Sequence, residues 1–144
     1  MEPTRRNKFS FETLTAIVVG TIVTVLIQQF FFKTPTLDEA MKKAAKDLNK
    51  TCPQMVDQYS RLDSTFVMPG HKFQYNYTLV NLEKSEVNLD TVKKYIEPGI
   101  INNVKTNPGL KKLREKKVTF NYCYRDKKGE FVLNIEVTPD RYKE

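Results

Sequence analysis

Nineteen consecutive residues near the N-terminus, 14–32, carry no charged side chain and read LTAIVVGTIVTVLIQQFFF. As an α-helix this run would be about 28 Å long, which is close to the hydrocarbon thickness of a bilayer. Three basic residues lie in the tail 1–13 and Lys33 follows the run. Basic residues at both borders are typical of a membrane span. The sequence therefore predicts a transmembrane helix at 14–32 and a separate domain at 33–144.

The apolar run is longer than the roughly 7–15 residues of a cleaved signal peptide, and no small-residue cleavage site follows it. An uncleaved signal anchor is the better interpretation. The basic tail favours a cytoplasmic N-terminus with the C-terminal domain outside. We therefore expect a single-pass protein of the bacterial inner membrane that contacts membrane lipid and exposes its domain to the periplasm.

A stripe of small and polar residues recurs every four positions within the run: Ala16, Gly20, Thr24 and Gln28. On a helix these positions share one face, which lets a second membrane helix approach closely. Such residues are also frequent in any transmembrane helix. A packing face for a protein partner and an ordinary lipid-facing anchor both remain open.

The remainder of the chain alternates between helical and strand periodicity. Thr36 and Glu39 form a capping-box pattern that predicts a helix ending near Asn49. Period-two alternation predicts strands at 55–68, 73–79, 118–124 and 131–137, and helical spacing recurs at 89–100 and 110–116. The order α-β-β-α-β-β predicts an α+β domain with a four-stranded antiparallel sheet packed by helices, a cystatin-like architecture. The expected core face is Tyr75, Tyr77, Phe120, Tyr122, Leu133 and Ile135.

Three segments carry a family resemblance: NKTCPQMVDQYSRLDSTF, FQYNYTLVN and NYCYRDKKGEF. With this order of helix, hairpin, helix and hairpin, the chain resembles a family of small, uncharacterised bacterial α+β proteins that are secreted or membrane-anchored. The resemblance covers roughly residues 37–142. It implies the fold and an extracytoplasmic location, and it implies no reaction.

No catalytic or metal-binding pattern stands out. The one histidine, His71, follows Pro69-Gly70 and is expected at an exposed turn, and no nucleophile, phosphate-loop or dinucleotide motif is present. Two cysteines and one histidine offer too few ligands for a zinc site. We therefore expect a protein that is not an enzyme and that uses no metal and no cofactor.

A polar face on the predicted sheet offers an alternative site for a small ligand: Asp57, Arg61, Asp63, Asn76, Asn121 and Arg125. A solvated sheet surface explains the same residues and is the favoured interpretation. Cys52 and Cys123 also leave two alternatives open, a disulfide in an oxidising compartment or two free thiols.

The chain carries a formal net charge of +7, and its basic residues are densest at 111–117. A location outside the cytoplasm argues against nucleic acid as the partner, so we expect none. The leading hypothesis is an accessory or interaction protein that contacts an envelope protein, as a small subunit of a membrane complex. The alternative is a small-ligand-binding or inhibitory domain that uses the polar sheet face.

Overall fold

The computed structural model describes residues 35–143, and residues 36–143 belong to one compact unit. No helix within 35–143 is long and apolar enough to cross a membrane. The transmembrane helix predicted at 14–32 lies outside the described residues, so the structure lends it no support.

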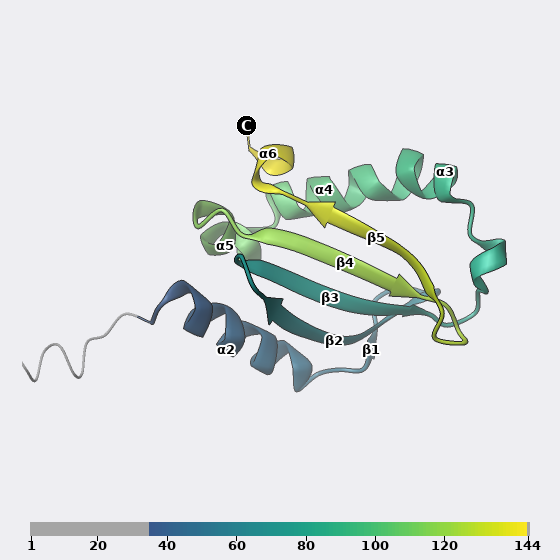
Figure 1. Cartoon of the computed structure of the whole chain (residues 1–144), viewed down its shortest axis with the longest axis horizontal. Coiled ribbons are helices and arrows are strands. Elements are labelled where there is room, and N and C mark those ends of the chain that lie inside the picture. Colours follow the sequence, from purple (N-terminus) through teal and green to yellow (C-terminus); the bar gives the residue numbers. More distant parts are fainter. Residues whose placement is uncertain (1–34, 144) are drawn as a thin grey trace, which may run out of the picture. The chain divides into compact units, whose positions relative to one another are not determined.

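Five strands and a set of helices make up the described chain (Figure 1). The helices are α2 (Leu37–Asn49), η1 (Lys84–Glu86), α3 (Leu89–Thr91), η2 (Val92–Ile96), α4 (Glu97–Thr106), η3 (Pro108–Leu110), α5 (Lys111–Glu115) and α6 (Pro139–Tyr142). The strands are β1 (Gln54–Met55), β2 (Ser60–Met68), β3 (Lys72–Leu79), β4 (Thr119–Arg125) and β5 (Phe131–Val137).

Helix α2 begins where the capping box predicts. The hydroxyl of Thr36 accepts a hydrogen bond from the backbone N–H of Glu39 at 3.3 Å, and the Glu39 carboxylate accepts one from the backbone N–H of Thr36 at 2.8 Å. Two backbone donors that lack helical partners are thereby satisfied. Met41 and Ala45, four residues apart, are buried against the sheet.

The sheet is mixed, with strand order β1-β2-β3-β4-β5, and the predicted four-stranded antiparallel sheet is wrong. The pairs β1–β2, β2–β3 and β4–β5 are antiparallel, whereas β3 and β4 are parallel. The physical reason lies in the connection from Leu79 to Thr119. It passes through six helical segments and returns to the end of the sheet where β3 begins, and a crossover of this kind joins parallel strands.

The helical part of this crossover is continuous from 89 to 106, although Pro98-Gly99 predicts an interruption. Pro98 lies in the first turn of α4, where its missing N–H costs little. The preceding turn, η2, is π-helical, and this wider turn joins α3 to α4 without a break.

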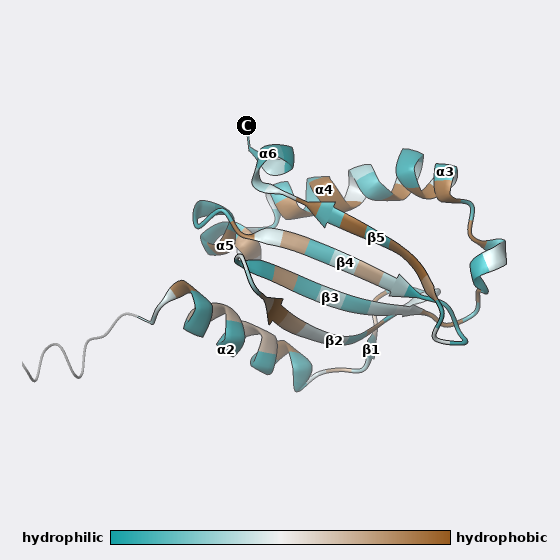
Figure 2. Cartoon of the chain, in the orientation of Figure 1, coloured by the Kyte–Doolittle hydropathy of each residue, from teal (hydrophilic) through white to brown (hydrophobic). Residues whose placement is uncertain are grey.

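Helices α2 and α4 pack on one face of the sheet and share a single core with it. Phe120 and Ile135 of the expected core face are buried at its centre, while Tyr75, Tyr77 and Leu133 are partly buried against it, so that prediction is confirmed. Along the strands hydrophobic and polar residues alternate, as Figure 2 shows, because successive side chains point to opposite faces.

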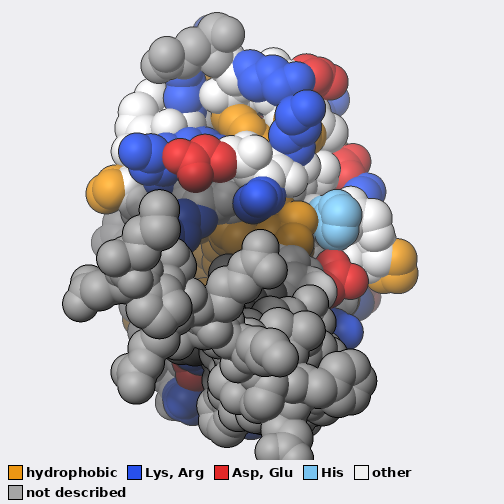
Figure 3. Space-filling view, turned by 90° about the vertical axis from the view of Figure 1, so that its left-hand side faces the viewer, with side chains coloured by type: hydrophobic (Ala, Val, Ile, Leu, Met, Phe, Trp, Pro, Cys, Tyr) orange, Lys and Arg blue, Asp and Glu red, His pale blue; other side chains and the backbone are white. Residues whose placement is uncertain are grey.

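Basic side chains gather at the end of the domain that carries α5 (Figure 3). The exposed ones in and next to this helix are Lys111, Lys112, Lys116 and Lys117. Arg114 is different, because its guanidinium donates hydrogen bonds to the backbone carbonyls of Val104 and Asn107 at 2.8 and 2.6 Å. The short basic helix predicted at 110–116 is confirmed.

Candidate functional site

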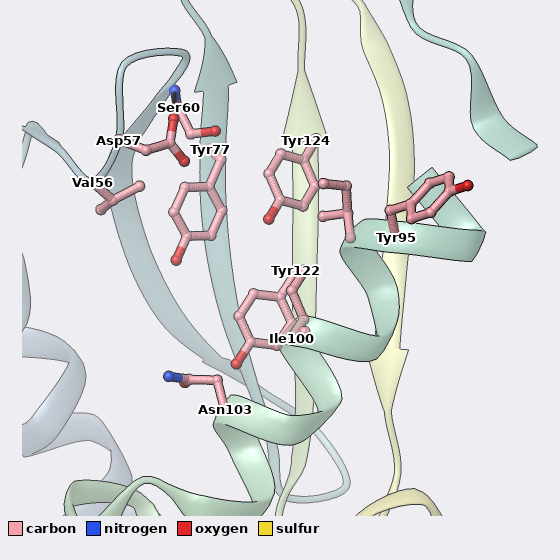
Figure 4. Close-up of a pocket in the computed structure, with 11 residues that line it drawn as sticks. Val56, Asp57, Ser60, Tyr77, Tyr95, Ile100, Asn103, Tyr122 and Tyr124 are labelled. Carbon is pink, nitrogen blue, oxygen red and sulfur yellow. Dashed lines mark hydrogen bonds between the residues drawn. The ribbon is translucent and has the colours of Figure 1, made fainter. Parts of the chain in front are cut away.

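Parallel pairing of β3 with β4 brings four tyrosines together on the helix-covered face. Tyr75 lies beside Tyr122 and Tyr77 beside Tyr124 in the strand register. The ring centroids within each pair are 5.1 Å apart, with interplanar angles of 13° and 16°. The four rings form a stacked block, and Figure 4 shows three of them projecting from the two neighbouring strands.

The hydroxyls of these four tyrosines make no hydrogen bond with any residue that the structure describes. Burial, with a smaller effect from the neighbouring charges of Cys52 and Asp57, raises the pKa of Tyr77 to about 12. Burial raises the pKa of Tyr75, Tyr122 and Tyr124 still further. All four phenols therefore stay protonated at neutral pH and can both donate and accept hydrogen bonds.

A cavity of about 390 Å³ lies over this block, between the segment 56–60 and helix α4. Its floor includes Tyr77, Tyr122 and Tyr124. From α4, Ile100 and Asn103 reach towards the floor, as Figure 4 shows. Tyr122 is only 8% exposed and is nevertheless part of the cavity lining, so its buried ring ends at an accessible surface.

A second cavity, of about 550 Å³, continues from the first towards η1 and α3. The two share five lining residues, Asp57, Ser60, Ile96, Ile100 and Tyr124, so they form one depression. We call the two cavities together the tyrosine groove. The lining of its second part is mainly apolar: Leu79, Leu82, Val87, Val92, Leu133 and Ile135.

Exposed hydrophobic side chains border the groove on two sides. Eight large hydrophobic residues are exposed in the described part of the chain, and six of them lie in the segments 55–59 and 89–96. They are Met55, Val56, Tyr59, Leu89, Tyr95 and Ile96. Tyr95, next to the π-helical turn, is the most exposed at 64%. Exposed hydrophobic residues grouped in this way are typical of interaction sites.

The groove carries acidic and no basic lining residues within the described chain; its charged members are Asp57 and Glu86. Oδ1 of Asp57 accepts hydrogen bonds from the backbone N–H groups of Tyr59 and Ser60, both at 2.7 Å. This turn holds Asp57 at the junction of the two cavities.

The polar residues predicted as an alternative site divide between two places. Arg61, Asp63, Asn76, Asn121 and Arg125 lie on the sheet face opposite the core, whereas Asp57 belongs to the groove. The sequence placed Asp57 on a strand with Arg61 and Asp63, but β2 begins only at Ser60.

Side chains on this opposite face bond mainly to one another. Asn121 donates to Gln74 at 2.8 Å and accepts from Asn134 at 2.7 Å. Asn76 donates to Ser64 at 3.0 Å. The Asp63 carboxylate accepts hydrogen bonds from Arg61 and from Thr78. Arg125 donates to the carbonyl of Gly129 at 2.9 Å. These polar groups already have partners, as in a solvated sheet surface.

Both cysteines are free thiols in the structure, so the disulfide alternative is not formed. Burial, together with the charge of Asp63, raises the pKa of the Cys52 thiol, which makes it a poor nucleophile.

His71 is exposed at the β2–β3 turn and lies 3.7 Å from the Asp38 carboxylate. No group of three or more metal-ligating side chains occurs in residues 35–143. Ala16, Gly20, Thr24 and Gln28 lie outside the described residues.

Sequence reasoning missed the groove residues Val56, Tyr95, Ile96 and Asn103. Ile96 belongs to the helical spacing predicted at 89–100, and the structure leaves it 50% exposed. Two neighbouring hydrophobic residues, Tyr95 and Ile96, one residue before Pro98-Gly99, were the available signal. Their exposure depends on which part of the crossover covers the sheet.

Comparison with known sequences places the chain in a family. Residues 36–133, more than half of the chain, match the family described as a domain of unknown function, DUF8479. The chain belongs to this family. This confirms the predicted resemblance to a family of unknown function. No curated protein matches the chain.

Solved bacterial structures share the fold. A Pseudomonas aeruginosa protein described as secreted has a TM-score of 0.64 at 13% identity, over 74% of this chain and 93% of that chain. The type II secretion system pilotin EpsS of Vibrio vulnificus has a TM-score of 0.58 at 9% identity, over 75% and 93%. The pilotin AspS of Vibrio cholerae has a TM-score of 0.56 at 10% identity, over 73% and 91%.

These neighbours contradict the localisation predicted from the sequence. They are described as a secreted protein and as pilotins of type II secretion systems, and not as single-pass proteins of the inner membrane. The predicted single-pass inner-membrane location is corrected on this ground.

Proposed function

We propose that this member of the DUF8479 family is a non-enzymatic accessory protein that binds a segment of a partner protein in the tyrosine groove. The observation that carries the proposal is the grouping of exposed hydrophobic side chains along the two borders of one groove, which hold six of the eight found in residues 35–143. Apolar surface beside a preformed groove gains free energy when a partner segment covers it.

The fold shared with type II secretion pilotins supports a role of this kind. The partner that we propose is a protein component of a secretion apparatus. The predicted contact with membrane lipid rested on residues outside the described part of the chain, and it stays a prediction.

The chemistry of the groove favours binding over catalysis. Its polar lining consists of phenols, amides, hydroxyls and two carboxylates, without a cysteine or a histidine among the described residues. Ser60 supplies the aliphatic hydroxyl in the described lining of the first cavity, but it is the backbone N–H of Ser60 that donates a hydrogen bond to Asp57, at 2.7 Å. A nucleophile needs a base within reach of its own proton, and no hydrogen bond joins the Ser60 hydroxyl to a base among the described residues.

The test compares partner recovery in affinity purification, from the native host, of the full wild-type chain and of a variant that carries a new charge on the groove border. Ile96→Asp is expected to remove the partner, because it places a carboxylate on the apolar border that the partner covers. Phe66→Asp is the matched control: Phe66 is a similarly exposed hydrophobic residue in β2, away from the groove lining.

Circular dichroism should show that both variants stay folded, since both positions are exposed. Recovery of the same partner with Ile96→Asp as with the wild type would contradict the proposal. Equal loss with Phe66→Asp would assign binding to the sheet rather than to the groove.

A further inference from the structure

We propose that the segment recognised by the tyrosine groove is apolar and carries a single lysine or arginine, which pairs with Asp57. This inference rests on the proposed function, because it names the chemistry of the segment that the groove binds. It follows from the distribution of charge, from the geometry of Asp57 and from the unpartnered phenols.

The charge of the groove is opposite to that of the protein. The chain holds 24 Lys and Arg against 17 Asp and Glu, yet neither cavity has a basic lining residue among those described. Asp57 and Glu86 leave the groove negative on a positive protein. A nucleic acid or an acidic peptide would be repelled here, whereas a cationic side chain would be attracted.

Asp57 has one carboxylate oxygen in use and one free. Oδ1 accepts the backbone N–H groups of Tyr59 and Ser60, and this pair of bonds fixes the orientation of the carboxylate. Oδ2 has no hydrogen-bond partner among the described residues. Asp57 lines both cavities, so a segment lying along the groove passes this free oxygen.

Aromatic surface adjoins the carboxylate. Tyr77 and Tyr124 lie close enough to Asp57 that its negative charge contributes to the raised pKa of both phenols, in addition to burial. A guanidinium or ammonium group at Asp57 would therefore also meet phenol oxygens and ring faces, both of which attract cations. Tyr122 adds a hydroxyl from a side chain that is 92% buried and has no hydrogen-bond partner in the described chain.

The second cavity of the groove explains why the bound segment must carry apolar residues. Leu82, Val92 and Leu133 line the second cavity, which at about 550 Å³ has room for more than one aliphatic or aromatic side chain. The ligand is thus a segment with several apolar residues and one cation, in which the apolar residues provide most of the affinity and the cation provides the register.

The experiment is selection of a displayed library of random twelve-residue peptides on the immobilised full chain. The wild type should enrich peptides with one lysine or arginine at a constant spacing from apolar residues. Asp57→Asn keeps Oδ1 for the turn and removes the charge, so it should enrich apolar peptides without the cation. Asp140→Asn on α6 removes one exposed charge outside the groove lining and should select the same peptides as the wild type.

The affinity of one selected peptide, measured by fluorescence anisotropy, allows a double-mutant cycle between Asp57 and the cation of the peptide. Asp57→Asn should weaken its binding about five-fold, and replacing the peptide's cation by glutamine should weaken binding similarly without a further loss in Asp57→Asn. Added salt should weaken binding to the wild type more than binding to Asp57→Asn.

Three outcomes separate the inference from the function beneath it. Apolar peptides that ignore charge, or a cation preference unchanged in Asp57→Asn, would overturn the inference and leave the proposed function standing. Peptides whose binding survives Ile96→Asp would overturn both, because the groove would then not be the binding site. A cation preference lost in Asp57→Asn alone supports both.

Discussion

Asp126 is the one charged side chain that is buried within residues 35–143, at 1% exposure. Its Oδ1 accepts the backbone N–H groups of Lys128 and Glu130 at 2.8 and 2.9 Å, and its Oδ2 accepts that of Lys84 at 3.1 Å. Burial raises the pKa of this carboxyl, but the three backbone donors outweigh burial and hold it below its ordinary value. Asp126 thus ties the β4–β5 turn to the loop that follows β3.

Asp126→Asn is expected to destabilise the domain at neutral pH, because an amide cannot accept the third N–H. A depressed carboxyl pKa contributes stability that is present above the ordinary pKa of about 3.8 and is lost as the pH falls through the lower pKa of the folded state. The difference in the free energy of unfolding between wild type and variant should therefore be constant from about pH 5 to 8 and shrink below about pH 4. Urea unfolding at several pH values measures this, and a difference that grows in acid would contradict the assignment.

Strand β5 shows how period-two alternation separates core from surface. Ile135 is 4% exposed on the core face, whereas Asn134, next to it, is exposed on the opposite face. Leu133 lies on the core side too but is only partly buried, since it lines the tyrosine groove. The same strand therefore contributes to the core at one end and to the groove at the other.

Ile135→Ala is expected to lower the free energy of unfolding by about 2–5 kcal/mol, since it removes buried methyl groups and leaves a cavity. Asn134→Ala should cost about 1 kcal/mol or less, because it removes one partly buried hydrogen bond, to Asn121, and no core packing. Urea unfolding of the two variants measures the contrast. Equal costs would mean that the assignment of faces in β5 is wrong.

The mixed sheet is a property of the whole domain, and the direction of its strands determines which residues of β3 and β4 lie opposite one another. Parallel β3 and β4 place Asn76 opposite Cys123 and Lys72 opposite Thr119, all on the face away from the helices. If β3 and β4 were antiparallel and Asn76 still lay opposite Cys123, the residue opposite Lys72 would be Lys127. Two cross-links four residues apart therefore report the strand direction.

In a Cys52→Ser background, Asn76→Cys is expected to form a disulfide with Cys123 on oxidation, because paired strands lie about 4.8 Å apart and disulfides span about 4.4–6.8 Å between Cα atoms. With both native cysteines replaced by serine, Lys72→Cys together with Thr119→Cys should cross-link as well. Thiol titration and intact mass detect both products. Gln74→Cys, whose partner is Asn121, is the control that should cross-link to Cys123 least. A first cross-link without the second would argue for antiparallel strands.

Local sequence patterns determined the elements of this domain. The capping box at Thr36, the alternation around Phe120 and Ile135, and the turn at Gly129, where φ is +83°, depend on residues close in the chain. Hydrogen bonds and side-chain periodicity within a few residues fix them, so the order of the four longer strands and of the helices between them could be predicted, whereas the short elements β1 and α6 were missed. The core face followed from the same alternation.

Strand direction, the pairing of Tyr75 with Tyr122, and the exposure of Ile96 were decided only by the tertiary structure. Each depends on the path of a crossover of about forty residues, and period-two alternation is the same whichever way a strand runs. Asp57 shows the consequence: its neighbours in sequence suggested a strand, whereas the structure places it in the lining of the same cavity as Tyr77 and Tyr124. A groove formed by segments far apart in the chain exists only once those segments pack together.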